Sequence, residues 1–211
     1  MKRNYNARSN YQSDQAFTDF VHEKLAVPII YHEMGWKPTT TEDSYQDKRD
    51  KKDGIDYQAE DHQGMKVTIQ ERFRDAFYAK YNDFTIRYTR EHSLRPGEQK
   101  SEFFKIDATY FVYGITNGSK FNNNTVTDFI KYIVFDVNQL KNLFRVGIIR
   151  VPDRFQRFSE IKEVDGKNVL YTAKNSNPDR SSEFIAIDPQ KLKEVLGDSI
   201  SHVVIKQKGF Y

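Results

Sequence analysis

The amino-terminal part of the chain carries apolar residues at helical spacing. They recur over residues 16–25, and Ser13 just before them is a typical helix cap. Pro28 is expected to end or kink this helix, and Gly35 to close the segment. Residues 37–52 contain almost no apolar side chain, so we expect an exposed connection there.

Beyond residue 54 the pattern changes to that of strands. Residues 65–74 alternate, with Val67, Ile69, Glu71 and Phe73 on one side of the predicted strand. A strand over 54–59 and a turn over 61–64 come before it, which predicts a hairpin. Further strands are predicted over 84–88, 106–113, 132–135, 183–187 and 202–206, and a short helix over 139–144.

The last third of the chain contains turn and cap signals. Asp165-Gly166 predicts the turn of a second hairpin, and residues 175–182 read as a polar loop. A helix is expected from Pro189 to Leu196, opened by the proline and closed by Gly197.

These elements predict one α/β domain with a mixed central sheet flanked by helices. We divide it into a flexible basic tail (1–13), a core (14–145) and a carboxy-terminal α/β extension packed on the same domain (146–211). The tail carries Lys2, Arg3 and Arg8 before the first acid. At 211 residues, one domain with additions is the simplest expectation.

Composition excludes several kinds of site. The chain has no cysteine, so disulfides, thiolate zinc sites and a cysteine nucleophile are ruled out. No apolar run approaches the roughly 18 residues of a membrane span, and the first residues lack the apolar stretch of a signal peptide. We therefore expect no membrane partner and a cytoplasmic location. The net charge of +3 is too small to indicate nucleic-acid binding by itself.

The predicted hairpin places chemically useful side chains together. Asp56 on the first strand is expected beside Gln70 and Arg72 on the second. A carboxylate, a carboxamide and a cation at one place can hold Mg²⁺ through oxygen ligands and face a phosphate. Glu71 lies on the apolar side of its strand and needs a partner there.

Three segments together resemble a known superfamily. Asp43-Ser44-Tyr45-Gln46, Gly54-Ile55-Asp56-Tyr57 and Val67-Thr68-Ile69-Gln70-Glu71-Arg72 are similar to the core of the PD-(D/E)XK phosphodiesterases. In that superfamily a helix with Glu or Gln precedes a strand that ends in a metal-binding Asp, and the next strand carries acid-x-Lys. The run from Phe104 to Gly114 is similar to the following strand of some phage and bacterial members.

The resemblance implies a restriction-endonuclease-like fold and a set of site residues. Glu23 would be the helix acid and Asp56 the metal-binding aspartate. Gln70-Glu71-Arg72 would be the (D/E)xK segment, with Mg²⁺ or Mn²⁺ held by Asp56 and by Gln70 or Glu71. The implied activity is endonucleolytic hydrolysis of DNA, in a bacterial cell and possibly phage-encoded.

Three arginines are candidate nucleic-acid contacts in this reading: Arg72 at the scissile phosphate, and Arg74 and Arg87 on strands expected near the same site. Gln70 stands where an acid is usual and Arg72 where the superfamily has lysine. Arginine cannot lose its proton at neutral pH, so Arg72 can clamp a phosphate but cannot act as a base.

Other interpretations remain open. The fold can be a catalytically decayed nuclease that binds nucleic acid or inhibits a protein, or an anti-defence interaction module that needs no metal. Asp56 can be an ordinary polar residue at a strand end, and Glu71 with Arg72 and Arg74 a charge ladder on a solvated face. Glu23 can be a simple exposed acid. A dimer is plausible.

Overall fold

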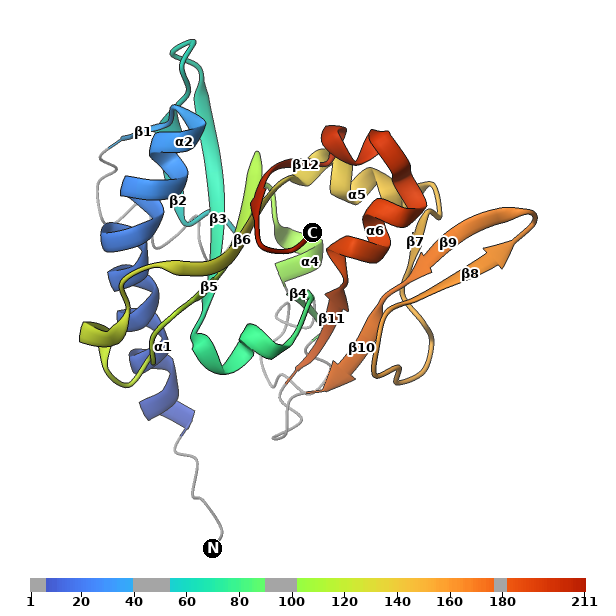
Figure 1. The fold of residues 1–211 in the computed structure, drawn as a ribbon, viewed down its shortest axis with the longest axis horizontal. Coiled ribbons are helices and arrows are strands. Elements are labelled where there is room, and N and C mark those ends of the chain that lie inside the picture. Colours follow the sequence, from blue (N-terminus) through green and yellow to red (C-terminus); the bar gives the residue numbers. More distant parts are fainter. Residues whose placement is uncertain (1–6, 40–53, 90–101, 177–181) are drawn as a thin grey trace, which may run out of the picture.

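The computed structural model describes residues 7–39, 54–89, 102–176 and 182–211, and one mixed sheet lies at its centre (Figure 1). Within these residues the sheet has six strands in the order β1-β2-β3-β5-β6-β12. Neighbouring strands are antiparallel except β3 and β5, which are parallel. The six strands are β1 (Lys37–Pro38), β2 (Tyr57–Glu60), β3 (Lys66–Arg74), β5 (Tyr110–Thr116), β6 (Phe129–Asp136) and β12 (Val204–Lys208).

Two smaller sheets complete the β structure of the described residues. One has the order β10-β11-β4 and the other β7-β9-β8. Their strands are β4 (Phe84–Thr89), β7 (Ile149–Arg150), β8 (Glu160–Val164), β9 (Lys167–Tyr171), β10 (Ala173–Ser176) and β11 (Glu183–Ile187). The β8–β9 hairpin projects from the body of the molecule (Figure 1).

Helices lie on both sides of the central sheet, which confirms a mixed α/β fold with flanking helices (Figure 1). The helical segments are α1 (Ala7–Val21), η1 (His22–Tyr31), α2 (His32–Met34), η2 (Ala76–Lys80), α4 (Glu102–Lys105), η3 (Asn123–Thr125), α5 (Val137–Arg145), α6 (Pro189–Leu196) and η4 (Gly197–His202). None of the helices among the described residues is long and apolar enough to cross a membrane.

The amino-terminal helix differs from the prediction at its start and at Pro28. It begins at Ala7, so residues 7–13 of the expected tail are helical and Ser13 is not the cap. It also continues through Pro28, within the π-helical segment η1. The helix ends at Gly35, as predicted, where a left-handed backbone with φ of 67° suits glycine.

Each face of the central sheet has its own core. On one face, Val67, Ile69 and Phe73 of β3 pack against residues of α1 and η1. On the other face, Phe111 and Tyr113 of β5 pack against α5, α6, β4 and β11. Because both faces of β5 are covered, all but its first residue is buried.

The turns follow their expected chemistry. Asp61 Oδ1 accepts hydrogen bonds from the backbone N–H of Gln63 (2.8 Å) and Met65 (2.9 Å), and so shapes the turn between β2 and β3. In the β8–β9 turn, Asp165 and Gly166 have φ of 51° and 72°, as an Asp-Gly hairpin requires. Helix α6 begins at Pro189 and ends before Gly197, as predicted.

Several predicted segments are wrong in part. The strands expected over 54–59, 106–113 and 202–206 begin only at Tyr57, Tyr110 and Val204. The loop expected over 175–182 begins later, because Asn175 and Ser176 pair with β11 as part of β10.

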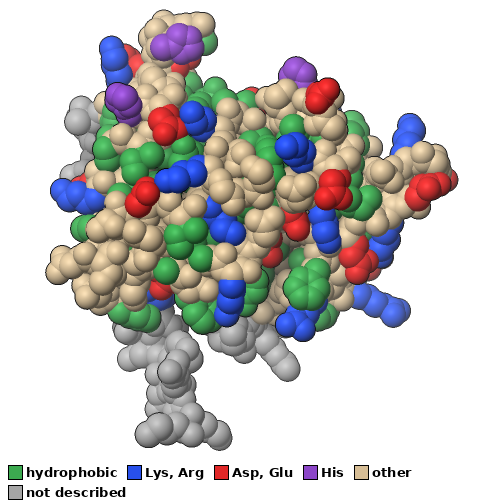
Figure 2. Space-filling model, viewed as in Figure 1, with side chains coloured by type: hydrophobic (Ala, Val, Ile, Leu, Met, Phe, Trp, Pro, Cys, Tyr) green, Lys and Arg blue, Asp and Glu red, His purple; other side chains and the backbone are tan. Residues whose placement is uncertain are grey.

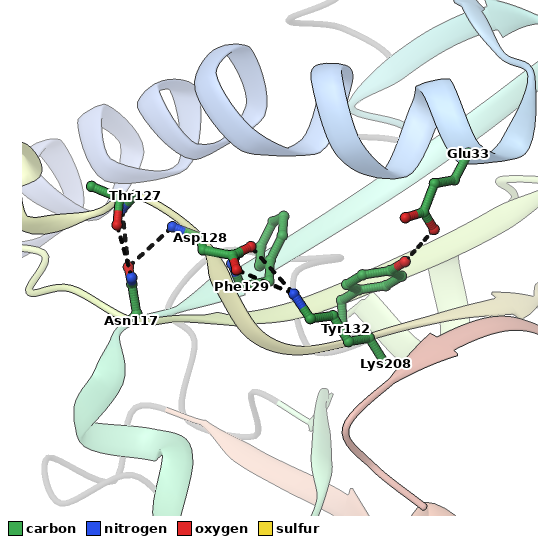
Figure 3. A network of polar contacts seen from close by, with 7 residues as sticks. All are labelled: Glu33, Asn117, Thr127, Asp128, Phe129, Tyr132 and Lys208. Carbon is green, nitrogen blue, oxygen red and sulfur yellow. Dashed lines mark hydrogen bonds and ion pairs between the residues drawn. The ribbon is translucent and has the colours of Figure 1, made fainter.

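A polar network fastens the amino-terminal helix and β12 to β6 (Figure 3). The Tyr132 hydroxyl on β6 donates a hydrogen bond to Glu33 of α2. Lys208 of β12 forms an ion pair with Asp128 at 3.2 Å. Asn117 Oδ1 accepts from the backbone N–H of Asp128 at 3.1 Å and fixes the loop before β6.

Candidate functional site

Asp56 lies immediately before β2 and opposite Gln70 of β3. Its backbone N–H donates to the Ile69 carbonyl at 2.9 Å, which continues the ladder that pairs Tyr57 with Ile69. Its Oδ2 accepts hydrogen bonds from Gln70 Nε2 and from the backbone N–H of Glu71, both at 2.7 Å. The predicted adjacency of Asp56 and Gln70 is therefore confirmed, although Asp56 precedes its strand and does not end it.

A glycine makes this close approach possible. Gly54 has φ of 59°, and a Cβ there would come within 3.2 Å of both Gln70 Oε1 and Ile106 Cα. Gln70 itself is only 8% exposed. Residues 54–56 thus lie against the Gln70 side chain, and any larger residue at position 54 would displace it.

Glu71 turns to the opposite face of β3, because successive side chains of a strand point to opposite sides. Its carboxylate is fully buried, and Oε2 lies 2.9 Å from Nδ1 of His22 on η1. The His22 ring stacks on Tyr57 with a centroid separation of 3.5 Å and contacts Tyr31 edge-on at 5.6 Å. His22, Tyr31, Tyr57 and Glu71 form what we call the buried cluster.

Two polar atoms of the buried cluster have no hydrogen-bond partner among the described residues. They are Glu71 Oε1 and the Tyr31 hydroxyl, and both are shielded from solvent. Burial, reinforced by the nearby Glu71 carboxylate, raises the pKa values of Tyr31 and Tyr57 well above the ordinary tyrosine value. Both tyrosines therefore stay neutral at physiological pH, and the cluster is a largely buried polar site and not a solvated charge ladder.

Basic side chains follow Gln70 on its own face of β3. Arg72 and Arg74 are half-buried. Arg72 is paired with Tyr113 in the register of β3 and β5, and Arg74 shares the face of Arg72. Burial raises the pKa of Tyr113, and the positive charges of Arg74 and Arg72 oppose that rise. Arg74 Nη2 donates to Thr85 Oγ1 at 3.5 Å, and its guanidinium lies 5.1 Å from the centre of the Tyr78 ring.

Two other predicted residues lie on neighbouring elements. Arg87 lies on β4, which pairs with β11 in a separate sheet, although Thr85 of the same strand accepts a hydrogen bond from Arg74. Glu23 is exposed on η1, as an ordinary surface acid would be. The segment Asp43-Ser44-Tyr45-Gln46 lies outside the described residues.

The side chains around Asp56 can be compared with the ligands that a divalent cation needs. No group of three or more His, Asp or Glu residues within the described ranges is close enough to hold a metal ion. Asp56 offers a carboxylate, and a half-turn of the Gln70 carboxamide would bring its oxygen to the position that Nε2 now occupies, 2.7 Å from Asp56 Oδ2. Glu71 does not join this pair, because its carboxylate faces His22.

His22 and Tyr57 are the parts of the arrangement that sequence reasoning missed. A signal was present, because an acid on the apolar side of β3 needs a partner from whatever covers that side. The covering element is the amino-terminal helix, where His22 directly follows the buried Val21. The hydrogen bond joins residues 49 apart in the sequence, so only the packing of helix on sheet reveals it.

Comparisons with protein-family models, curated proteins and solved structures find no match to this chain. Its class is thus defined by the structure alone: a mixed α/β protein with an Asp56–Gln70 pair on one face of β3 and the buried cluster around Glu71 on the other.

Proposed function

We propose that this protein is a metal-dependent phosphodiester hydrolase acting on DNA, built on a PD-(D/E)XK-like core. The observation that carries the proposal is the contact of Asp56 with Gln70 at 2.7 Å, with Arg72 two residues further along the same face of β3. A helix, an aspartate at the next strand and a polar-x-basic segment on its neighbour follow each other in the order that the superfamily uses.

Each side chain has a role in this proposal. Asp56 and Gln70 would hold Mg²⁺ or Mn²⁺ through a carboxylate and a carboxamide oxygen. When bound, the metal ion supplies Lewis-acid chemistry and a more acidic water. Arg72 remains protonated and stabilises the negative charge that grows on the phosphate during attack. Arg74, at the end of the same strand, contacts the nucleic-acid backbone.

A second candidate is favoured by the hydrogen bonds of Asp56. Its Oδ2 already accepts from two N–H groups, and the neighbouring acid Glu71 is paired with His22. These contacts satisfy both carboxylates with groups of the protein. The second candidate is therefore a nuclease-like core that binds nucleic acid, or inhibits a protein, without cutting.

The test is cleavage of plasmid and single-stranded DNA with Mg²⁺ or Mn²⁺, beside EDTA, for the wild type, Asp56→Ala and Asp198→Ala. Asp198 is an exposed acid on η4 and serves as the matched control. We expect cleavage to require metal, to fall on the order of a hundredfold in Asp56→Ala, and to be unchanged in Asp198→Ala.

Two results would contradict this assignment. Undiminished cleavage by a folded Asp56→Ala variant would remove Asp56 from the site. No cleavage by the folded wild type with either metal would favour the second candidate. Circular dichroism of each variant checks that the fold is intact.

A further inference from the structure

The segment that follows β3 exposes an unusual number of aromatic rings. Phe77, Tyr78 and Tyr81 are 64%, 36% and 42% exposed, all within or just after the short helix η2. Together with Arg74 and Lys80 we call them the η2 surface. Figure 2 shows hydrophobic and basic side chains next to one another along the lower edge of the molecule, where η2 runs in Figure 1.

Cations accompany the rings of the η2 surface. Lys80 Nζ lies 4.0 Å from the centre of the Phe77 ring and 5.2 Å from that of Tyr81. The Arg74 guanidinium lies 5.1 Å from the centre of the Tyr78 ring. Rings and cations are thus interleaved over a few residues, which is the arrangement that places bases on rings and phosphates on cations.

The acids beside this segment do not cancel its charge at the surface. Asp75 is buried, and its Oδ2 accepts from the Lys120 backbone N–H at 3.4 Å. Asp83 and Asp188 are half-buried, Asp83 near Lys131 and Asp188 as an acceptor for Asn82 Nδ2 at 3.4 Å. The exposed side chains of residues 74–83 are Phe77, Tyr78, Lys80, Tyr81 and Asn82, which include no acid.

The surface is also held in place by the backbone. The Ala76 N–H donates to the Gly118 carbonyl at 2.9 Å, and the Tyr81 N–H to the Tyr78 carbonyl at 3.0 Å. Lys131 Nζ donates to the Tyr81 carbonyl at 2.8 Å. A fixed platform loses little conformational entropy when a ligand stacks on it.

From these observations we infer that the η2 surface binds single-stranded DNA and leads it to Asp56 and Gln70. Ring faces can stack on bases only where the bases are unpaired, so a single strand fits better than a duplex. Arg74 connects the η2 surface with the Asp56–Gln70 pair, because it is the last residue of β3 and lies about 13 Å along the strand from Gln70. The choice of DNA as the ligand rests on the proposed function, whereas the binding surface is inferred from the geometry alone.

The experiment measures binding without cutting. Fluorescence anisotropy in EDTA gives the Kd of a labelled oligonucleotide of about 15 nucleotides, single-stranded or in a duplex, over a range of salt. The proteins are the wild type, the double variant Phe77→Ala/Tyr81→Ala, and the single variants Phe155→Ala, Lys80→Gln and Lys162→Gln. Phe155 is a matched control, because it is a phenylalanine of similar exposure (70%) in the segment between β7 and β8.

We expect the single strand to bind more tightly than the duplex. The double variant should raise the Kd for the single strand about tenfold or more. Phe155→Ala is expected to have no effect. Lys80→Gln should lower the slope of log Kd against log salt by about 0.7, the loss of one phosphate contact, whereas Lys162→Gln on the β8–β9 hairpin should not.

Three results would overturn the inference. The first is equal binding of strand and duplex with no effect of the ring substitutions. The second is a loss of affinity in Phe155→Ala as large as the loss in the double variant. The third is no DNA binding together with self-association that the ring substitutions abolish, which would make the η2 surface a protein interface. If the η2 surface binds as expected and no metal supports cleavage, the hydrolase proposal fails while this inference stands.

Discussion

A shielded acid lies on each side of the central sheet, and the two acids have different neighbours. Glu71, on the face covered by the amino-terminal helix, is fully buried and lies 2.9 Å from His22. Asp83, on the other side, is half-buried and faces a second acid, Asp188, as well as Lys131. Burial first, and the charge of Asp188 second, raise the pKa of Asp83 to about 6.

The difference shows that a shielded acid takes its properties from the elements packed around it. The amino-terminal helix supplies an imidazole to Glu71. The cap of α6 supplies another carboxylate to Asp83, because Asp188 is held there by the N–H groups of Gln190 and Lys191. Four substitutions test this comparison, from the largest expected effect to the smallest.

His22→Ala should lower the free energy of unfolding by about 3 kcal/mol, because it leaves the Glu71 carboxylate buried without its partner. Urea unfolding at neutral pH measures the loss. His62→Ala, in the exposed β2–β3 turn, is the control and should change stability by less than about 0.5 kcal/mol. A loss below 1 kcal/mol for His22→Ala would mean that the pair contributes little.

Asp83→Asn should remove a pH dependence of stability. The pKa of Asp83 is raised in the folded protein, so its contribution to stability is complete below about pH 4 and is lost as the pH rises through about 6. The loss should be about 1–2 kcal/mol after allowance for its partial exposure. The variant should therefore be more stable than the wild type at pH 8 in urea unfolding. An unchanged pH profile, matching that of Asp198→Asn, would contradict this.

Gln70→Glu should place a second carboxylate beside Asp56, where the amide now donates at 2.7 Å. We expect a destabilisation of about 1 kcal/mol in EDTA from the like charges. Mg²⁺ should recover this loss, because a ligand that binds only the folded state stabilises it. Thermal unfolding with and without Mg²⁺ measures both effects. A variant that is indifferent to Mg²⁺ would argue against a cation site at this pair.

Tyr132→Phe should have the smallest effect, a loss of about 0.5–1 kcal/mol, because it removes the hydrogen bond to the partly exposed Glu33. The same hydrogen bond lowers the pKa of Glu33, so the stability difference between wild type and variant should shrink as the pH falls below 4. Tyr78→Phe, whose hydroxyl has no comparable role, is the control. A difference that persists unchanged at pH 3 would contradict the assigned hydrogen bond.

The sequence predicts local structure well, but it predicts poorly which side chains meet between the helix layer and the sheet. The strand over 65–74 and the Asp56–Gln70 contact follow from alternation and a tight turn, both local properties. Pro28 is expected to end or kink the helix, and the sequence cannot decide between the two. The helix continues as a π-helical segment, with Leu25, Ala26 and Ile30 packed in the core beside the sheet. The His22–Glu71 pair depends on how the helix lies over the sheet, which no local pattern specifies.

The pairing of β12 with β6 has a consequence for the synthesis of the chain. About 70 residues separate Asp136, which ends β6, from Val204, which begins β12. At about 5–20 residues per second, a ribosome needs several seconds to make them. During that time the outer edge of β6, where six of eight residues are buried in the finished fold, has no strand to pair with. Nascent chains would therefore be most open to chaperone capture, or to aggregation, at this edge.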